Sequence, residues 1–100
     1  MVKHIVMWGL KDGANGMTKK QIADKMKEQL NALRPIIREI RSLEVGVNFF
    51  ESPASYDVVL YAEFDSKDDL QAYQIHPDHV KLKDFIGAVT DKRAVVDYEV

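Results

Sequence analysis

Four segments of the chain have the apolar patterns of β-strands. In the second, Leu43, Val45 and Val47 alternate with polar or small residues, which is the two-residue period of a strand with one solvated face. The first and third segments are apolar at almost every position, and the fourth again has a polar side. We therefore predict strands over residues 2–9, 43–49, 56–64 and 94–100.

Two further segments carry apolar residues at helical spacing. The first begins after Thr18, which is predicted to form a capping box with the glutamine three residues later. Its regular part should end near Arg34, because Pro35 cannot donate a backbone hydrogen bond. The second begins after Ser66 and is broken at Pro77, since proline suits the first position of a new helix.

The order β-α-β-β-α-β predicts an α+β fold of the ferredoxin-like type, with helices layered on a four-stranded antiparallel sheet. Strands that are apolar on both faces belong in the middle of a sheet, so we expect the first and third strands there. The helices cover only one face of such a sheet. The other face would expose an apolar patch larger than soluble monomers tolerate, so we expect a homodimer through the sheet face.

Composition narrows the class of protein. One hundred residues, 46% of them hydrophobic and 30% charged, are typical of a single globular domain over 1–100. The formal net charge of −2 gives no reason to expect nucleic acid or an anionic membrane as a partner. The absence of cysteine and of a recognisable leader or membrane span predicts a cytoplasmic protein.

The candidate chemistry centres on Tyr73 to His79, which contains two of the three histidines of the chain and one aromatic hydroxyl. His76 and His79 are three residues apart, but a zinc site needs three or four ligands, and only His4 remains as a further histidine. We therefore expect neither a metal site nor another cofactor. A neutral imidazole at His79, in the first turn of a helix, is suited to general-base work near neutral pH.

Five short motifs follow one another along the chain: Val2 to Val6, Ile40 to Gly46, Tyr56-Asp57, Ala72-Tyr73 with His76-Pro77-Asp78-His79, and Val95 to Tyr98. In this order and spacing they resemble the stress-responsive dimeric α/β-barrel (Dabb) domain family. The resemblance covers essentially the whole chain and implies a homodimer whose two sheets close into a barrel. It leaves the chemistry open, because most bacterial members of the family have no known activity.

One plant branch of this family consists of cofactor-free polyketide cyclases, and its catalytic residues match positions of this chain. The resemblance implies that His79 is the general base of an intramolecular aldol closure. Tyr73 and His4 would orient this base and the substrate carbonyl. Trp8 and His76 are the candidate substrate-binding residues.

Structural roles are the alternative for each of these residues. His76 precedes a proline and is suited to capping a helix, and His4 shares its strand face with Val6 and Trp8, as a core histidine would. Tyr73 and His79 could simply link two helical segments by hydrogen bonds.

Three functions therefore remain open. The first is a dimeric stress-responsive protein that binds a small molecule without catalysis. The second is a cofactor-independent enzyme acting on a carbonyl compound, as a cyclase or an isomerase, with His79 as its base. The third is an antibiotic-biosynthesis-type monooxygenase that uses Trp8 and a histidine.

Overall fold

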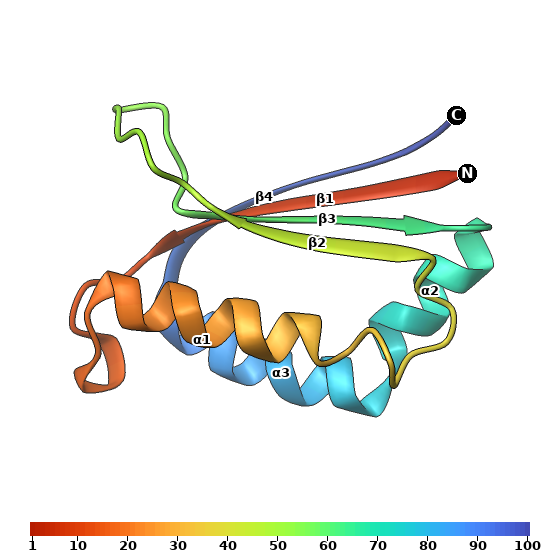
Figure 1. The fold of residues 1–100 in the computed structure, drawn as a ribbon, viewed down its shortest axis with the longest axis horizontal. Helices are drawn as coiled ribbons and strands as arrows, with labels where there is room; N and C mark the ends of the chain where they lie inside the picture. Colours follow the sequence, from red (N-terminus) through yellow and green to blue (C-terminus); the bar gives the residue numbers. More distant parts are fainter.

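The computed structural model describes residues 1–100, which form one sheet and one layer of helices (Figure 1). The sheet has the order β2-β3-β1-β4, and every neighbouring pair is antiparallel. This is the predicted ferredoxin-like arrangement, with the two apolar strands in the middle. The elements in chain order are β1 (Val2–Leu10), a short 3-10 turn (Ala14–Gly16), α1 (Lys19–Asn31), β2 (Ser42–Val47), β3 (Val58–Phe64), α2 (Lys67–Ile75), α3 (Pro77–Val89) and β4 (Thr90–Glu99).

Local sequence signals account for the starts of all three helices. Thr18 Oγ1 accepts a hydrogen bond from the Gln21 amide at 3.2 Å, and the Gln21 side chain accepts one from the Thr18 amide at 2.9 Å. Ser66 Oγ accepts from the Asp69 amide at 3.1 Å and so caps α2. Pro77 is the first residue of α3, as predicted.

Four element boundaries differ from the prediction by two or more residues, and one of them is the start of β3, at Val58 instead of Tyr56. The helix α1 ends at Asn31, because the amides of Leu33 and Arg34 bond to carbonyls only three residues back before Pro35 interrupts the pattern. The strand β2 ends at Val47, and the Phe49 side chain is 97% exposed instead of continuing the alternation. The strand β4 begins at Thr90, because a register shift between Gly9 and Leu10 extends its pairing with β1.

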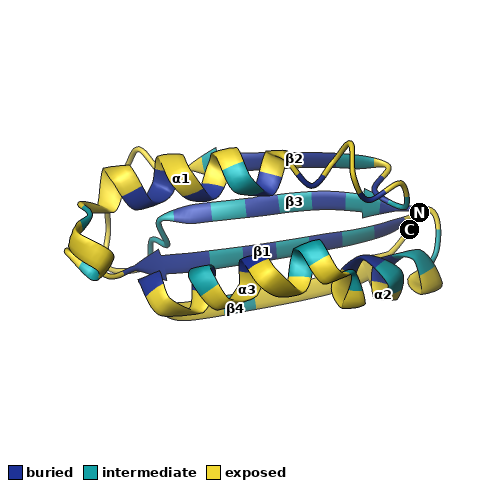
Figure 2. Ribbon diagram, turned by 90° about the horizontal axis from the view of Figure 1, so that it is seen from below, coloured by how far each residue is buried: buried dark blue, intermediate teal, exposed yellow.

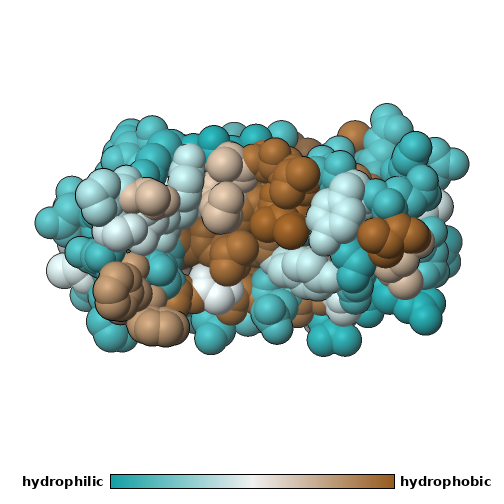
Figure 3. Space-filling model, turned by 90° about the horizontal axis from the view of Figure 1, so that it is seen from above, coloured by the Kyte–Doolittle hydropathy of each residue, from teal (hydrophilic) through white to brown (hydrophobic).

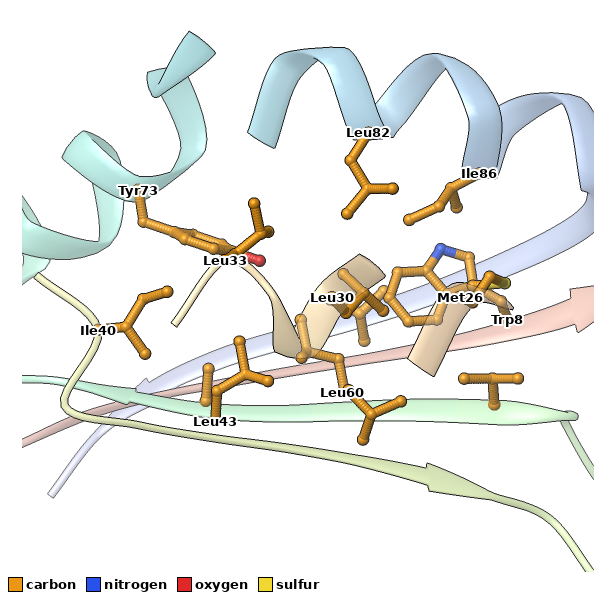
Figure 4. Close-up of a cluster of buried hydrophobic side chains, with 14 of the residues drawn as sticks. Trp8, Met26, Leu30, Leu33, Ile40, Leu43, Leu60, Tyr73, Leu82 and Ile86 are labelled. Carbon is orange, nitrogen blue, oxygen red and sulfur yellow. The ribbon is translucent and has the colours of Figure 1, made fainter. Parts of the chain in front are cut away.

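The three helices all lie on one face of the sheet, which we call the helix face. The helix α1 runs along the β2 side and α3 along the side of β1 and β4 (Figure 2). Side chains of Trp8, Leu60, Met26 and Ile86 interleave between the two layers in the hydrophobic core (Figure 4). None of the helices has the length and apolar character that a bilayer crossing requires.

The opposite face of the sheet, which we call the open face, has no helix over it. Its middle is an apolar band, visible in Figure 3 as a brown area flanked by polar surface. At one end of this face, Lys3 Nζ donates to Tyr61 Oη at 2.7 Å and to Glu63 Oε2 at 2.9 Å. The strand positions that supply the band are Ile5, Met7, Val59, Ala94 and Val96.

Candidate functional site

A cavity of about 530 Å³ lies on the helix face, between the sheet and α3. Its wall combines apolar side chains with two histidines and two cationic side chains, and no carboxylate lines it. Such a mixture of apolar surface and a few polar groups is typical of small-molecule sites. The lining residues are His4, Val6, Trp8, Leu30, Leu60, Gln74, Ile75, His79, Lys83, Ile86, Gly87, Thr90 and Arg93.

His4 reaches the cavity because even-numbered residues of β1 point to the helix face. The residue is only 3% exposed, and its cross-strand partner on β4 is Asp97. His4 Nδ1 hydrogen-bonds to Asp97 Oδ1. An ionised carboxylate can only accept, so Nδ1 carries the proton of this bond, and Nε2 is the free acceptor of the neutral ring.

His79 lies in the first turn of α3 and is held in a similar way. Its Nδ1 is 3.0 Å from the carbonyl oxygen of Gln74, the next-to-last residue of α2. A carbonyl oxygen only accepts, so Nδ1 carries the hydrogen and Nε2 keeps its lone pair. Burial lowers the pKa of His79 below its usual 6.5; the Gln74 carbonyl opposes this shift, and the charges of Lys83, His4 and Arg93 reinforce it.

Tyr73 packs between the two histidines. The centroid of its ring lies 6.0 Å from that of His4 and 4.3 Å from that of His79. Its side chain is fully buried behind the cavity wall, and its hydroxyl is the one buried side-chain polar atom without a hydrogen-bond partner. Burial raises the pKa of Tyr73, so the hydroxyl keeps its proton and is available as a donor.

The other two predicted residues are in different situations. Trp8 lines the cavity, with its indole ring between β1 and α3 next to Ile86 (Figure 4). His76 does not line the cavity, so its predicted contact with a substrate there is not supported by its position. Its Nδ1 accepts a hydrogen bond from the Asp78 amide at 3.1 Å and thereby caps α3. No group of three or more potential ligands is arranged to hold a metal ion.

Sequence reasoning missed four groups of this site: the carboxylate of Asp97, the Gln74 carbonyl, and the cations of Lys83 and Arg93. The register of β4 against β1 places Arg93 opposite Trp8 and Asp97 opposite His4, on the same face. The polar alternation of the last strand was visible in the sequence, but it indicated only a solvated edge. Lys83 was interpreted as part of a solvated helix face, whereas its side chain reaches the cavity.

Comparisons with known proteins agree on the family and the fold. A curated stress-response A/B barrel domain-containing protein from Arabidopsis thaliana is 30% identical over 99 residues. That match covers 98% of this chain and 36% of the Arabidopsis protein, so the chain spans about a third of that protein's length.

Two solved structures are similar over nearly the whole chain. A dimeric protein of unknown function with a ferredoxin-like fold from Bacteroides fragilis has a TM-score of 0.84 and 37% identity, with 99% of this chain and 95% of that one covered. A dimeric ferredoxin-like protein of unknown function from Thermobifida fusca has a TM-score of 0.83 and 25% identity, with 99% and 90% covered. Residues 2–100 match the model of the stress responsive A/B barrel domain, and the chain belongs to this family, Dabb.

Proposed function

We propose that this chain binds a small carbonyl compound in the helix-face cavity and catalyses proton transfer on it without a cofactor, with His79 as the general base. The observation that carries this proposal is the hydrogen bond from His79 Nδ1–H to the Gln74 carbonyl, which leaves Nε2 unprotonated in a ring that lines the cavity. The lowered pKa of His79 keeps the ring neutral at physiological pH.

The chemistry that fits this arrangement begins with removal of a proton from the carbon next to a carbonyl group. His79 Nε2 takes the proton, the C–H electron pair forms a carbon–carbon double bond, and the carbonyl oxygen becomes an enolate. The enolate then attacks a second carbonyl carbon of the same molecule, or takes a proton back at another carbon. Either outcome returns the proton from His79 and needs no oxidant.

Two further residues support the base in this proposal. His4 offers a second imidazole, which the hydrogen bond to Asp97 orients. The Tyr73 hydroxyl keeps its proton and donates to a carbonyl or enolate oxygen through a water molecule. Because Tyr73 does not itself line the cavity, we assign it a positioning role.

Two structures with the same fold are named as enzymes: a hydroxynitrile lyase from Passiflora edulis, at 22% identity and a TM-score of 0.80, and an antibiotic biosynthesis monooxygenase, at 17% and 0.75. At these identities they support the fold alone. A monooxygenase function is the alternative that Trp8 favours, because its indole lines the same cavity as His4. It predicts oxygen uptake with a quinol or polycyclic phenol, and this uptake should be lost in Trp8→Phe.

The test of the proposed base is hydrogen–deuterium exchange at carbon, followed by proton NMR in heavy water with a panel of ketones and 1,3-diketones. The native chain should accelerate exchange of at least one compound by about 100-fold or more over buffer. His79→Asn keeps an N–H donor for the Gln74 carbonyl but has no base, so it should lose this acceleration. His76→Asn is the matched control, because asparagine also caps helices and His76 lies outside the cavity lining. Equal acceleration by His79→Asn and the native chain would contradict the proposal.

We also propose that a second copy of the chain covers the open face. The apolar band of that face supports this, because stable monomers rarely leave so much contiguous apolar surface in water. Similar chains whose structures are described as dimeric give further support. In such a dimer the helix-face cavity stays on the outer side of each sheet. A cytoplasmic location remains a prediction from the sequence.

A further inference from the structure

The charges around the cavity are all of one sign. Lys83 of α3 and Arg93 of β4 both line it, and neither makes an ion pair within the chain. The Asp97 carboxylate lies four residues further along β4 than Arg93, on the same face, and His4 engages it. The two cations therefore border a partly apolar hollow with no acidic partner of their own.

The cations also share the cavity with the proposed base. Lys83 lies one helical turn after His79 on α3, and Arg93 lines the same cavity from β4. In agreement with this placement, both charges contribute to lowering the pKa of His79. Thr90 is not a competing polar contact, because its hydroxyl donates to the Ile86 carbonyl at 2.8 Å. An entering molecule thus meets positive charge on the β4 and α3 sides and imidazole nitrogen further in.

We propose that the cavity takes an anionic carbonyl compound whose carboxylate or phosphate group lies between Lys83 and Arg93, with its apolar body against Trp8 and Ile86. This inference rests on the proposed function and specifies its substrate class. A guanidinium binds carboxylate and phosphate oxygens in a bidentate manner, and lysine adds a flexible point charge. The bound anion offsets the positive potential at His79, so the base becomes stronger only when its substrate is present.

The single tryptophan of the chain allows a direct test. Its indole lines the cavity, so one indole N–H signal in a proton–nitrogen NMR spectrum reports occupancy. Three probes are titrated: 4-oxo-4-phenylbutanoate, its uncharged methyl ester, and phenyl phosphate. In the native chain at least one anion should bind about tenfold more tightly than the ester.

Two variants remove the cations, and a third is their control. In Lys83→Met and Arg93→Met, the preference for the anion over the ester should fall towards unity. Lys81 lies on the same helix but does not line this cavity. Lys81→Met should therefore prefer the anion over the ester as strongly as the native chain does. Raising the salt concentration should weaken binding of the anion and leave that of the ester unchanged.

The outcomes separate this inference from the proposed function. Binding of the carboxylate alone, of the phosphate alone, or of both supports the inference and identifies the anion. Equal affinity of anion and ester in the native chain, or no indole shift with any probe at millimolar concentration, overturns it. Failure of the proposed function appears in a different measurement, as deuterium exchange that does not depend on His79.

Discussion

The Tyr73 ring packs against the His79 ring at a centroid distance of 4.3 Å and a tilt of 46°, while its buried hydroxyl has no partner within the chain. An unpaired buried hydroxyl costs stability, and a phenylalanine would pack the same ring without that cost. The pair therefore combines a favourable aromatic contact with a polar group that folding alone does not require. This combination is expected where the hydroxyl serves the chemistry of the site.

We expect Tyr73→Phe to leave the free energy of unfolding unchanged or to raise it by about 1 kcal/mol, because it removes an unsatisfied buried group. The same variant should slow the exchange reaction at least tenfold. Urea unfolding and proton NMR measure the two effects. Tyr61→Phe is the control: its hydroxyl bonds to Lys3 and Glu63, so that change should lower stability and spare the reaction. Full activity in Tyr73→Phe would assign the hydroxyl no role.

Removing Asp97 should change the tautomer of His4. In the native chain the carboxylate holds the hydrogen on Nδ1, and Asp97→Ala removes that acceptor. Nitrogen-15 NMR of the imidazole should report a mainly Nδ1–H ring in the native chain and loss of this preference in the variant. Glu99→Ala, two residues further along β4, is the control and should leave the His4 signals in place. A native His4 carrying its hydrogen on Nε2 would contradict the assigned geometry.

The stability of the chain should fall as the pH drops below about 6.5 because of His79. Burial lowers its pKa in the folded state, so the unfolded chain binds more protons in this range and stability rises with pH. The free energy of unfolding in urea, measured at about pH 7.5 and pH 5.5, should therefore change less between the two pH values in His79→Asn than in the native chain. His76→Asn is the matched histidine control and should behave like the native chain. If the free energy of unfolding changes with pH equally in the native chain and in His79→Asn, the pH dependence does not come from His79.

Glu63 should contribute to acid unfolding at a lower pH. Hydrogen bonds from Lys3, Ser42 and Tyr61 lower its pKa from 4.5 to about 2. A carboxylate with a lowered pKa stabilises the fold above its unfolded value, and this stabilisation is lost as the pH falls from about 4.5 towards 2. In urea unfolding as a function of pH, Glu63→Gln should lose less of its free energy of unfolding over this acidic range than the native chain. Glu44→Gln, an exposed change on the same sheet face, should lose as much as the native chain.

Val95 and Val96 provide a matched pair for the proposed dimer. They are neighbours on β4 with similar exposure, 42% and 51%, but Val95 pairs with Val6 on the helix face and Val96 with Ile5 on the open face. Val96→Lys should convert a dimer to a monomer at micromolar concentration in analytical ultracentrifugation, because it buries a charge in the apolar band. Val95→Lys should remain a dimer. A native chain that sediments as a monomer would contradict the open-face assembly.

Local signals were enough to predict most of the fold. The Thr18 capping box and Pro77 mark helix starts through contacts within a few residues, so the sequence alone contains them. The two-sided apolar character of β1 and β3 likewise identified the central strands. The early end of β2 was missed because alternation continues to Phe49, while the backbone leaves the sheet near Asn48.

The candidate site was predictable only in part. His4 and His79 were identified, but the partner of His4 lies 93 positions away, and finding it requires the register of β4 against β1. That register includes the shift at Gly9 and Leu10, which no pattern of residue types specifies. Distinguishing Lys83, which faces the cavity, from Lys81, which does not, requires the rotation of α3 against the sheet.

The strand β1 contributes to both faces of the sheet with alternating residues. His4, Val6 and Trp8 point to the helix face, and Ile5 and Met7 between them point to the open face. A substitution at an even position of this strand alters the cavity, and one at an odd position alters the surface available for assembly. Within one nine-residue segment, ligand specificity and oligomerisation can therefore diverge independently during evolution.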